Sequence, residues 1–196
     1  ISGTHQQLFK QLWGLRQGIK AARVDTARNQ VISCAFRCTL CQHRCGRRNS
    51  RLGLKEIQET IEKIQPLPGA KEFLDELRSF SQVILISDTF AEFASPLMEK
   101  LGRPTLFCNS LEVSGNGEIT GYKMRVEQTK LTTVKALQSI GFETIASGDS
   151  YNDLGMIQAS KAGFLFKSTD QIKKDNPDLP AFETYDELLA AIKKAL

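Results

Sequence analysis

The sequence predicts an α/β protein built on a parallel sheet, and two observations support this fold class. Along residues 52–196, short apolar runs alternate with longer amphipathic segments. Residues 83–86 are continuously apolar, as is typical of a strand that is covered on both faces. Strands and helices that alternate at this spacing predict a parallel sheet with right-handed crossovers.

The individual elements follow from periodicity and from turn residues. Apolar residues at 54, 57, 61 and 64 predict a helix, which Pro66 and Pro68 end. Further helices are expected at 69–78, 90–101, 130–140, 154–162 and 185–196, with a short one within 168–181. Strands are expected at 83–86, 105–108, 143–147 and 163–166. The glycine-rich turn at 114–117 predicts a hairpin between 111–113 and 118–122.

Length and composition indicate a globular chain of one α/β domain, with room for a small inserted subdomain. The chain has 196 residues, of which 41% are hydrophobic and 24% are charged. It contains no run of eighteen apolar residues, so we expect no membrane span. Since the amino end does not show a basic start before an apolar core, we expect no signal peptide and a cytoplasmic location.

The net charge of +4 hides a strong asymmetry between two parts of the chain. Residues 1–51 carry +9, with ten Lys and Arg against one acid, whereas residues 52–196 carry −5. Four of the five cysteines and both histidines also lie in the first part. Such a basic segment is typical of a nucleic-acid-binding arm, but no aromatic stacking platform accompanies its arginines, so nucleic acid is not expected as a partner.

The candidate site centres on the stretch from Gly148 to Asp153. It follows an expected strand and precedes an expected helix, which is where ligands bind in open α/β sheets. Asp149 and Asp153 are four residues apart and therefore share one side of a helical turn. Carboxylates this close together suit Mg²⁺. An N-cap at Asp149 or Ser150 is the alternative, and the two interpretations are equally supported by this stretch alone.

Two further polar residues lie at the ends of expected elements. Ser87 follows the strand at 83–86, and Lys130 begins a helix. Alone, Ser87 is typical of a turn and Lys130 of a solvated surface. Together with the two aspartates, however, they supply what a phosphoryl-transfer site needs: a hydroxyl donor, a cation for the phosphoryl oxygens and carboxylates for Mg²⁺.

These motifs resemble those of the haloacid-dehalogenase-like phosphatase superfamily. The resemblance covers about residues 52–196 and is greatest to the phosphoserine phosphatase branch, in particular to bifunctional phosphoserine phosphatase/homoserine phosphotransferases. It is carried by the helix entry at 67–70 and by the motifs at 86–90 and 148–153. It implies a three-layer sandwich with a mostly parallel sheet, Mg²⁺ as cofactor and phosphoserine as a small phosphorylated substrate. Transfer of the phosphoryl group to homoserine is a second implied activity.

The resemblance also implies roles for individual residues. Ser87 and Asp88 would contact the substrate or its phosphate. Lys130 would neutralise the phosphoryl group, with Lys135 as the alternative lysine. Asp149 would bind Mg²⁺ directly, and Asp153 would support the metal or its water. The remaining expected substrate or phosphate contact is Asn152. Asp88-Thr89 departs from the glycines that phosphoserine phosphatases often carry there, which leaves the substrate preference open.

The family's first motif, whose aspartate is the nucleophile, is not found in this sequence. It belongs at the end of the first strand, but residues 1–51 contain one acid, Asp25, with no acid two residues later and no apolar strand before it. We therefore do not assign Asp25 as the nucleophile. Without covalent catalysis through an aspartyl-phosphate, the chain is expected to be a very poor phosphatase.

Two explanations remain open for residues 1–51. A reading-frame error or mis-called start would account for the change of composition at Leu52; alternatively, the segment has a function of its own. The cysteine cluster, accompanied by His43, has the spacing of a zinc or iron–sulfur site, and its members are Cys34, Cys38, Cys41 and Cys45.

The sequence thus predicts three parts. Residues 1–51 form an anomalous segment that is not natively folded, residues 52–66 are the remnant of an incomplete helical cap, and residues 67–196 form the core domain. The expected function is Mg²⁺-dependent hydrolysis of a phosphate monoester. The alternatives are an inactive phosphate- and Mg²⁺-binding module and a cysteine-rich metal- or nucleic-acid-binding arm on this scaffold. The oligomeric state is left open.

Overall fold

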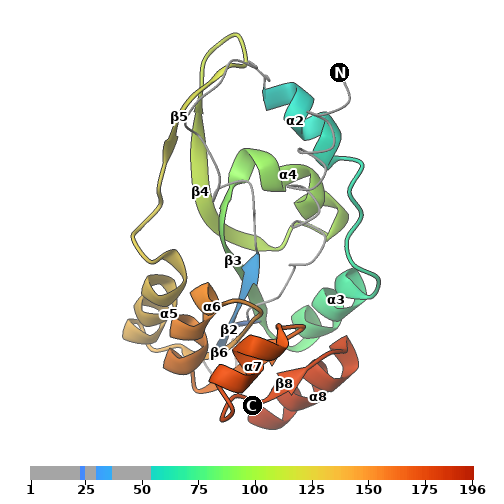
Figure 1. Cartoon of the computed structure of the whole chain (residues 1–196), viewed down its shortest axis with the longest axis vertical. Coiled ribbons are helices and arrows are strands. Elements are labelled where there is room, and N and C mark those ends of the chain that lie inside the picture. The colour runs from blue at the N-terminus through green and yellow to red at the C-terminus, as the bar shows by residue number, and fades with distance from the viewer. Residues whose placement is uncertain (1–22, 25–29, 37–53) are drawn as a thin grey trace.

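A computed structural model describes residues 23–24, 30–36 and 54–196, the first two ranges as backbone alone (Figure 1). One sheet organises them, with the strand order β5-β4-β3-β2-β6-β7-β8 and with β1 beside β3. Neighbouring strands are parallel except in the pairs β4–β5 and β1–β3. The strands are β1 (Arg23–Val24), β2 (Gln30–Phe36), β3 (Gln82–Phe90), β4 (Thr105–Val113), β5 (Ile119–Lys123), β6 (Glu143–Gly148), β7 (Ala162–Phe166) and β8 (Ala181–Phe182).

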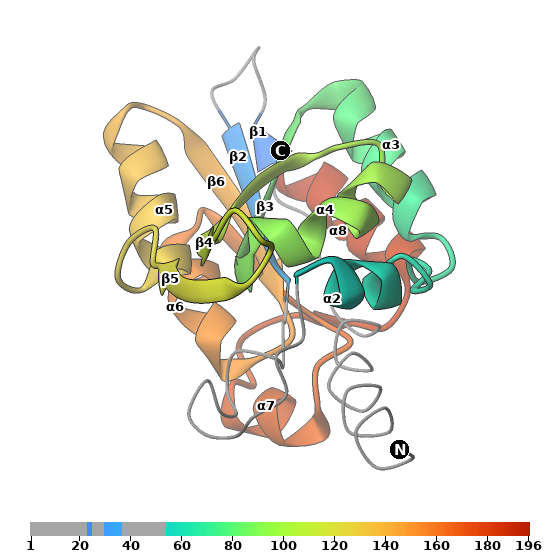
Figure 2. The ribbon, with the colours of Figure 1, turned by 90° about the horizontal axis from the view of Figure 1, so that it is seen from above.

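Helices cover both faces of this sheet. Figure 2 shows α5 and α6 on one side of it and α3, α4 and α8 on the other. The predicted three-layer α/β fold with a mostly parallel sheet is confirmed. The helices are α2 (Leu54–Ile61), α3 (Ala70–Phe80), α4 (Ala91–Lys100), α5 (Thr129–Ser139), α6 (Tyr151–Ala159), α7 (Asp170–Asp175) and α8 (Tyr185–Ala195).

The hydrophobic core lies where the sequence pattern places it. The apolar face of α3 is buried at Ala70, Phe73, Leu74 and Leu77, and the strand residues Leu85 and Ile86 are fully buried in the sheet. At about 25 cal/mol per Å² of buried apolar surface, each such side chain contributes roughly 1.5–3 kcal/mol. This packing fixes β3, and so fixes the strand end that carries the site.

Two strands are longer than the sequence predicts. β3 continues beyond the expected end at residue 86 and reaches Phe90, where it pairs with Asn109 after a register shift. The shift leaves Ser87 and Asp88 outside the regular β3–β4 ladder, although Ser87 still pairs with Phe36 of β2. The two strands expected at 105–108 and 111–113 form the single strand β4, which makes the predicted hairpin with β5.

A strand that the sequence pattern did not reveal occupies the middle of the sheet. β2 lies between β3 and β6 and runs parallel to both, with Cys34 opposite Leu85 on one side and Ser147 on the other. A short apolar run without periodicity does not distinguish a strand from irregular chain, which is why it was missed. Since most of residues 1–51 lie outside the described residues, their predicted lack of native folding stays a prediction.

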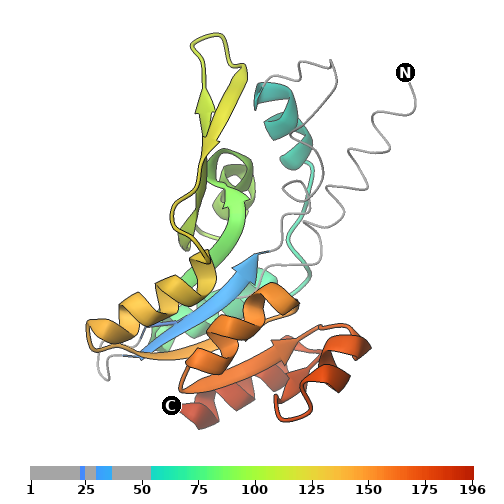
Figure 3. The same cartoon turned by 60° about the vertical axis from the view of Figure 1, so that its left-hand side comes forward.

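Helix α2 and the β4–β5 hairpin stand at one end of the molecule. Figure 3 shows β2 pointing toward this end. The backbone N–H of Leu54 donates to the Gly117 carbonyl at 3.0 Å, and Gln58 donates to the Glu92 carbonyl at 2.8 Å, so α2 is tied to the hairpin and to α4. That residues 52–66 are the remnant of a cap stays a prediction. Within the described part of the chain, no helix has the length and apolar character needed to span a bilayer.

Candidate active site

The sequence-predicted residues meet at the carboxyl ends of β3 and β6 and at the beginnings of α5 and α6. β2 separates these two strands, with Phe36 opposite Ser87 on β3 and Cys34 opposite Ser147 on β6. Since all three strands are parallel, their carboxyl ends open at the same edge of the sheet. In open α/β sheets this edge is where ligands bind.

Asp153 is the most heavily engaged side chain of the site. It is fully buried, and its Oδ2 accepts hydrogen bonds from the backbone N–H groups of Asp149 and Ser150 and from the Ser150 hydroxyl, each at 2.9 Å. Its Oδ1 accepts from the Lys130 ammonium at 2.6 Å. Ser150 is the N-cap of α6. The structure therefore shows the N-cap in this turn, whereas metal binding by its aspartates stays a prediction.

Gly148 is required by this arrangement. A Cβ atom at position 148 would lie 2.3 Å from the Cβ and 2.6 Å from the Cγ of Asp153. Neither distance is compatible with two packed carbon atoms. The glycine lets the end of β6 approach the first turn of α6 closely enough for Asp153 to collect its backbone donors.

Lys130 lies in the first turn of α5 with only 6% of its side chain exposed. Cations are disfavoured at a helix N-terminus, so the neighbouring carboxylates must hold it there. Burial acts to lower the pKa of Lys130, but the charges of Asp153 and Asp88 and their hydrogen bonds outweigh it and raise the pKa above the usual value. Lys130 is therefore cationic. The alternative lysine, Lys135, is exposed on α5.

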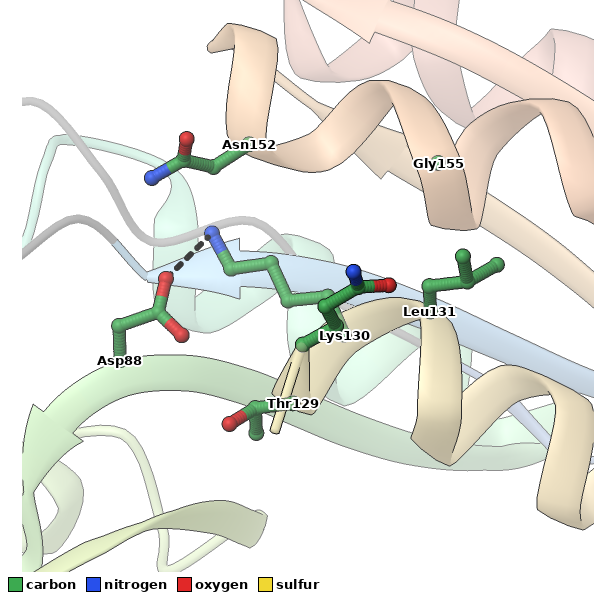
Figure 4. A pocket seen from close by; sticks show the side chains of 7 residues that line it. Asp88, Thr129, Lys130, Leu131, Asn152 and Gly155 are labelled. Atoms are coloured by element: carbon green, nitrogen blue, oxygen red, sulfur yellow. Dashed lines mark ion pairs between the residues drawn. The ribbon is translucent and has the colours of Figure 1, made fainter. Parts of the chain in front are cut away.

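A pocket of about 400 Å³ opens over Lys130 (Figure 4). The second carboxylate that contacts Lys130 belongs to Asp88. Its Oδ2 lies 3.4 Å from the Lys130 Nζ, and 40% of the Asp88 side chain is exposed. Figure 4 shows the Lys130 ammonium between the Asp88 carboxylate and the Asn152 amide. The lining residues are Asp88, Gln128, Thr129, Lys130, Leu131, Asn152 and Gly155. The structure thus brings Asp88, Lys130 and Asn152 together around one opening.

Ser87 lies within β3, directly before the pocket-lining residue Asp88, and does not line the pocket itself. It is fully buried, and its hydroxyl oxygen accepts from the Thr89 backbone N–H at 3.1 Å. This bond fixes the side chain relative to the extended chain that carries Asp88. Ser87 and Lys130 are therefore anchored by different elements, β3 and α5.

In this turn, Asp149 is the residue whose carboxylate suits a hard cation such as Mg²⁺. Asp153 already accepts four donors, including Lys130, and its support of a metal or its water stays a prediction. Asp149 is partly exposed beside it. Mg²⁺ commonly binds through one or two carboxylates plus substrate phosphate oxygens, and Asp149 meets the first requirement. Over the described ranges, no group of three or more histidine, cysteine, aspartate or glutamate side chains could hold a metal.

Asn109 and Arg125 belong to the same constellation, although sequence reasoning missed both. Asn109 is 1% exposed; its amide donates to the Asp88 carbonyl at 3.1 Å, and its oxygen accepts from the Arg125 backbone N–H at 3.0 Å. The Arg125 guanidinium lies 4.6 Å from the centre of the Phe107 ring and donates to Thr133 on α5. A polar residue directly after the expected strand 105–108 was the available signal for Asn109.

Gln128 adds a strained backbone to the mouth of the pocket. It precedes α5 with φ 46° and ψ 51°, a left-handed conformation that is uncommon for residues other than glycine. Such conformations cost about 1–3 kcal/mol and tend to cluster at functional sites. At this position, the turn sets the direction from which α5 presents Lys130.

β2 carries no acidic residue of its own. Its last three residues are Cys34, Ala35 and Phe36, and the sequence from 37 to 53 contains no acid. Asp25 lies outside the described residues, but the preceding residue, Val24, pairs with Gln82 at the amino end of β3. Ser87 lies five residues farther along β3 than Gln82, a distance of roughly 16 Å at about 3.3 Å per residue.

The sequence of this chain is similar to those of known hydrolases. A family model described as haloacid dehalogenase-like hydrolase matches residues 5–161. Phosphoserine phosphatase ThrH of Pseudomonas aeruginosa is 43% identical over 144 residues, which cover 74% of this chain and 70% of that protein. A phosphoserine phosphatase of Pseudomonas syringae pv. tomato is 42% identical over the same share of this chain, and the match spans 61% of its own length.

Solved structures show the same relationship. A substrate-bound phosphoserine phosphatase complex superimposes with a TM-score of 0.60 at 27% identity, covering 72% of this chain and 71% of that one. A phospho-aspartyl intermediate analogue of phosphoserine phosphatase superimposes with a TM-score of 0.59 at 28% identity, with the same two coverages. The fold, the family match and these relatives agree: this chain belongs to the haloacid dehalogenase-like hydrolases and is of the phosphoserine phosphatase type.

Proposed function

We propose that the pocket over Lys130 binds the phosphoryl group of a small phosphorylated amino acid, phosphoserine, together with Mg²⁺, and that the chain turns this substrate over very poorly. The observation that carries the proposal is the buried Lys130, held between Asp153 at 2.6 Å and Asp88 at 3.4 Å at the mouth of a pocket. A cation held this firmly is suited to receive phosphoryl oxygens without reorganising.

Each residue of the pocket then has a defined task. The Lys130 ammonium and the Ser87 hydroxyl would contact phosphoryl oxygens, and Asn152 would offer its amide from the other side of Nζ. Asp153 would hold Lys130 in place and set the turn. Asp149 would hold Mg²⁺, which supplies positive charge to offset that of the phosphate. Ordering these groups before the substrate arrives reduces the entropy that binding has to overcome.

The low turnover follows from the end of β2. Hydrolysis of the kind that the family resemblance implies requires an aspartate that attacks phosphorus. β2 lies between the strands that carry Ser87 and Gly148 but ends in Cys34, Ala35 and Phe36. Removing the nucleophile of a comparable catalytic unit costs many powers of ten in rate. Because β2 lacks this aspartate, the second candidate function is a binding module that retains the pocket but does not catalyse hydrolysis.

Two further candidates stay predictions. Transfer of the phosphoryl group to homoserine would need the same missing nucleophile. We therefore expect this transfer to be as slow as hydrolysis. A metal-binding arm would need all four clustered cysteines, and three of them, Cys38, Cys41 and Cys45, lie outside the described residues. No described contact favours either function.

Binding and turnover are tested separately on the full chain. Isothermal titration with O-phosphoserine, with and without Mg²⁺, should show binding that Mg²⁺ strengthens. Asp149→Asn should remove the Mg²⁺ effect, and Lys130→Met should weaken binding in both conditions. Asp178→Asn is the matched control, because Asp178 is an exposed aspartate between α7 and β8 that does not line the pocket. Absence of binding in the wild-type chain, or an Mg²⁺ effect that survives Asp149→Asn, would contradict the proposal.

A further inference from the structure

Asp88 places a negative charge at the mouth of a pocket that is proposed to receive an anion. Lys130 already has a close counter-ion in Asp153, at 2.6 Å and fully buried. Asp88 lies farther from the ammonium, at 3.4 Å, and 40% of its side chain is exposed. Around Lys130, Asp88 and Asp153 thus set two carboxylates against one ammonium. For a bare phosphate this balance is unfavourable.

The position of Asp88 is fixed by its surroundings. The buried Asn109 amide donates to the Asp88 carbonyl at 3.1 Å, and the next residue, Thr89, is buried with its N–H bonded to Ser87 at 3.1 Å. The Asp88 backbone is therefore held on both sides. It lies in the segment where β3 departs from the regular ladder with β4. A side chain on a fixed backbone that projects into a pocket is suited to recognise a ligand group.

We propose that Asp88 is a specificity-determining residue: its carboxylate receives the ammonium group of a phosphorylated amino acid and disfavours phosphate esters that lack a nearby positive charge. The inference rests on the proposed function, because it assumes that the phosphoryl group lies on Lys130. It goes further by assigning the amino group to Asp88.

Covalent geometry permits this contact. In phosphoserine, four bonds separate phosphorus from the amino nitrogen, so the two atoms are at most about 5 Å apart. Asp88 Oδ2 lies 3.4 Å from Lys130 Nζ. An ammonium group linked to a phosphoryl group on Lys130 can therefore reach Asp88 without leaving the pocket. Unit charges at 4 Å attract by about 1 kcal/mol even in water, a factor of about five in affinity.

The test compares two ligands that differ only in the amino group: O-phosphoserine and phosphorylated β-hydroxypropionate. Their dissociation constants are measured by titration at one fixed Mg²⁺ concentration on the wild-type chain, Asp88→Asn, Asp88→Glu and the control Asp178→Asn. The wild-type chain should prefer phosphoserine at least about fivefold. Asp88→Asn should bind the analogue more tightly and lose the preference, whereas Asp88→Glu and Asp178→Asn should keep it.

Each outcome bears on one of the two proposals. If the wild-type chain binds both ligands but shows no preference, or if Asp88→Asn keeps the preference, the role of Asp88 is wrong and the phosphate pocket stands. If Asp88→Asn changes both affinities by the same factor, Asp88 only tunes Lys130, and the inference is again overturned. If the wild-type chain binds neither ligand, the proposed function fails, and the inference fails with it. A wild-type chain that binds both ligands without a preference overturns the inference even if a variant does not fold.

Discussion

Replacing Asp153 by asparagine should destabilise the chain strongly, even without any ligand. The substitution keeps the shape of the side chain but removes the charge that faces Lys130 at 2.6 Å, and both side chains are buried. Breaking a buried ion pair by removing one partner typically costs about 3–5 kcal/mol, because the remaining charge is left in a poorly solvated place. Asp88 stays at 3.4 Å from the ammonium, so we expect a value near the lower limit, about 3 kcal/mol.

Chemical unfolding by urea, followed by circular dichroism, measures this change. Asp178→Asn should stay within roughly 0.5 kcal/mol of the wild-type chain, as for other exposed positions. In a double-mutant cycle, Lys130→Met should recover much of the loss that Asp153→Asn causes, because no buried ammonium then remains. If Asp153 served chiefly as a metal ligand, its removal would relieve repulsion from Asp149. Unchanged or increased stability of Asp153→Asn would therefore refute the structural role.

The pH dependence of the same measurement follows from Lys130. The folded chain raises the pKa of Lys130, so the stability that its ion pair contributes is fully present below the ordinary lysine pKa of about 10.4. It is lost as the pH rises through the higher pKa of the folded state. The difference between the wild-type chain and Asp153→Asn should thus be constant from pH 6 to 9 and shrink above about pH 10.4.

Three further predictions concern the surroundings of the site. Gly148→Ala would place a Cβ 2.3 Å from the Cβ of Asp153, so it should lower the free energy of unfolding in urea by about 1–3 kcal/mol. Gly115→Ala, with open space around its Cβ, should lower it little. Asn109→Ala should lower the free energy of unfolding by about 0.5–1.5 kcal/mol for each of the two part-buried hydrogen bonds that it removes, measured against the exposed Asn116→Ala; equal costs would contradict this. Burial, followed by the charge of Glu92 and opposed by Arg125, raises the pKa of Cys108 to about 11. At pH 8 its thiolate fraction should be roughly 200-fold below that of an ordinary thiol, and rapid alkylation of its peptide, read by mass spectrometry, would contradict the burial.

The sequence predicted the sheet and its helices because these depend on local periodicity. The apolar face of α3 and the continuous run in β3 both pack as expected. The strand β2 was missed because its apolar run is short and lies in a segment without flanking helical patterns. Its place is decided by pairing with β3 and β6, which are far away in the sequence.

Part of the candidate site was predictable in the same way. Lys130, Asp149 and Asp153 stand out in the sequence because they lie at element ends, and the structure brings Lys130 together with Asp153 and Asp88. Asn109 was not assigned, because its two hydrogen bonds, to Asp88 and Arg125, depend on the register between β3 and β4. The engagement of Asp153 by four donors likewise depends on how closely Gly148 lets β6 approach α6.

Phosphorus NMR of the full chain mixed with O-phosphoserine and Mg²⁺ tests the central claim most directly, since one spectrum reports binding and turnover. The account predicts that the phosphoserine resonance broadens or shifts with the wild-type chain, less so with Lys130→Met, and that no inorganic phosphate resonance grows beside it. An inorganic phosphate resonance that grows with the wild-type chain and disappears with Asp149→Asn would contradict the account, because hydrolysis would then proceed without an aspartate at the end of β2. An unchanged phosphoserine resonance would contradict the pocket itself.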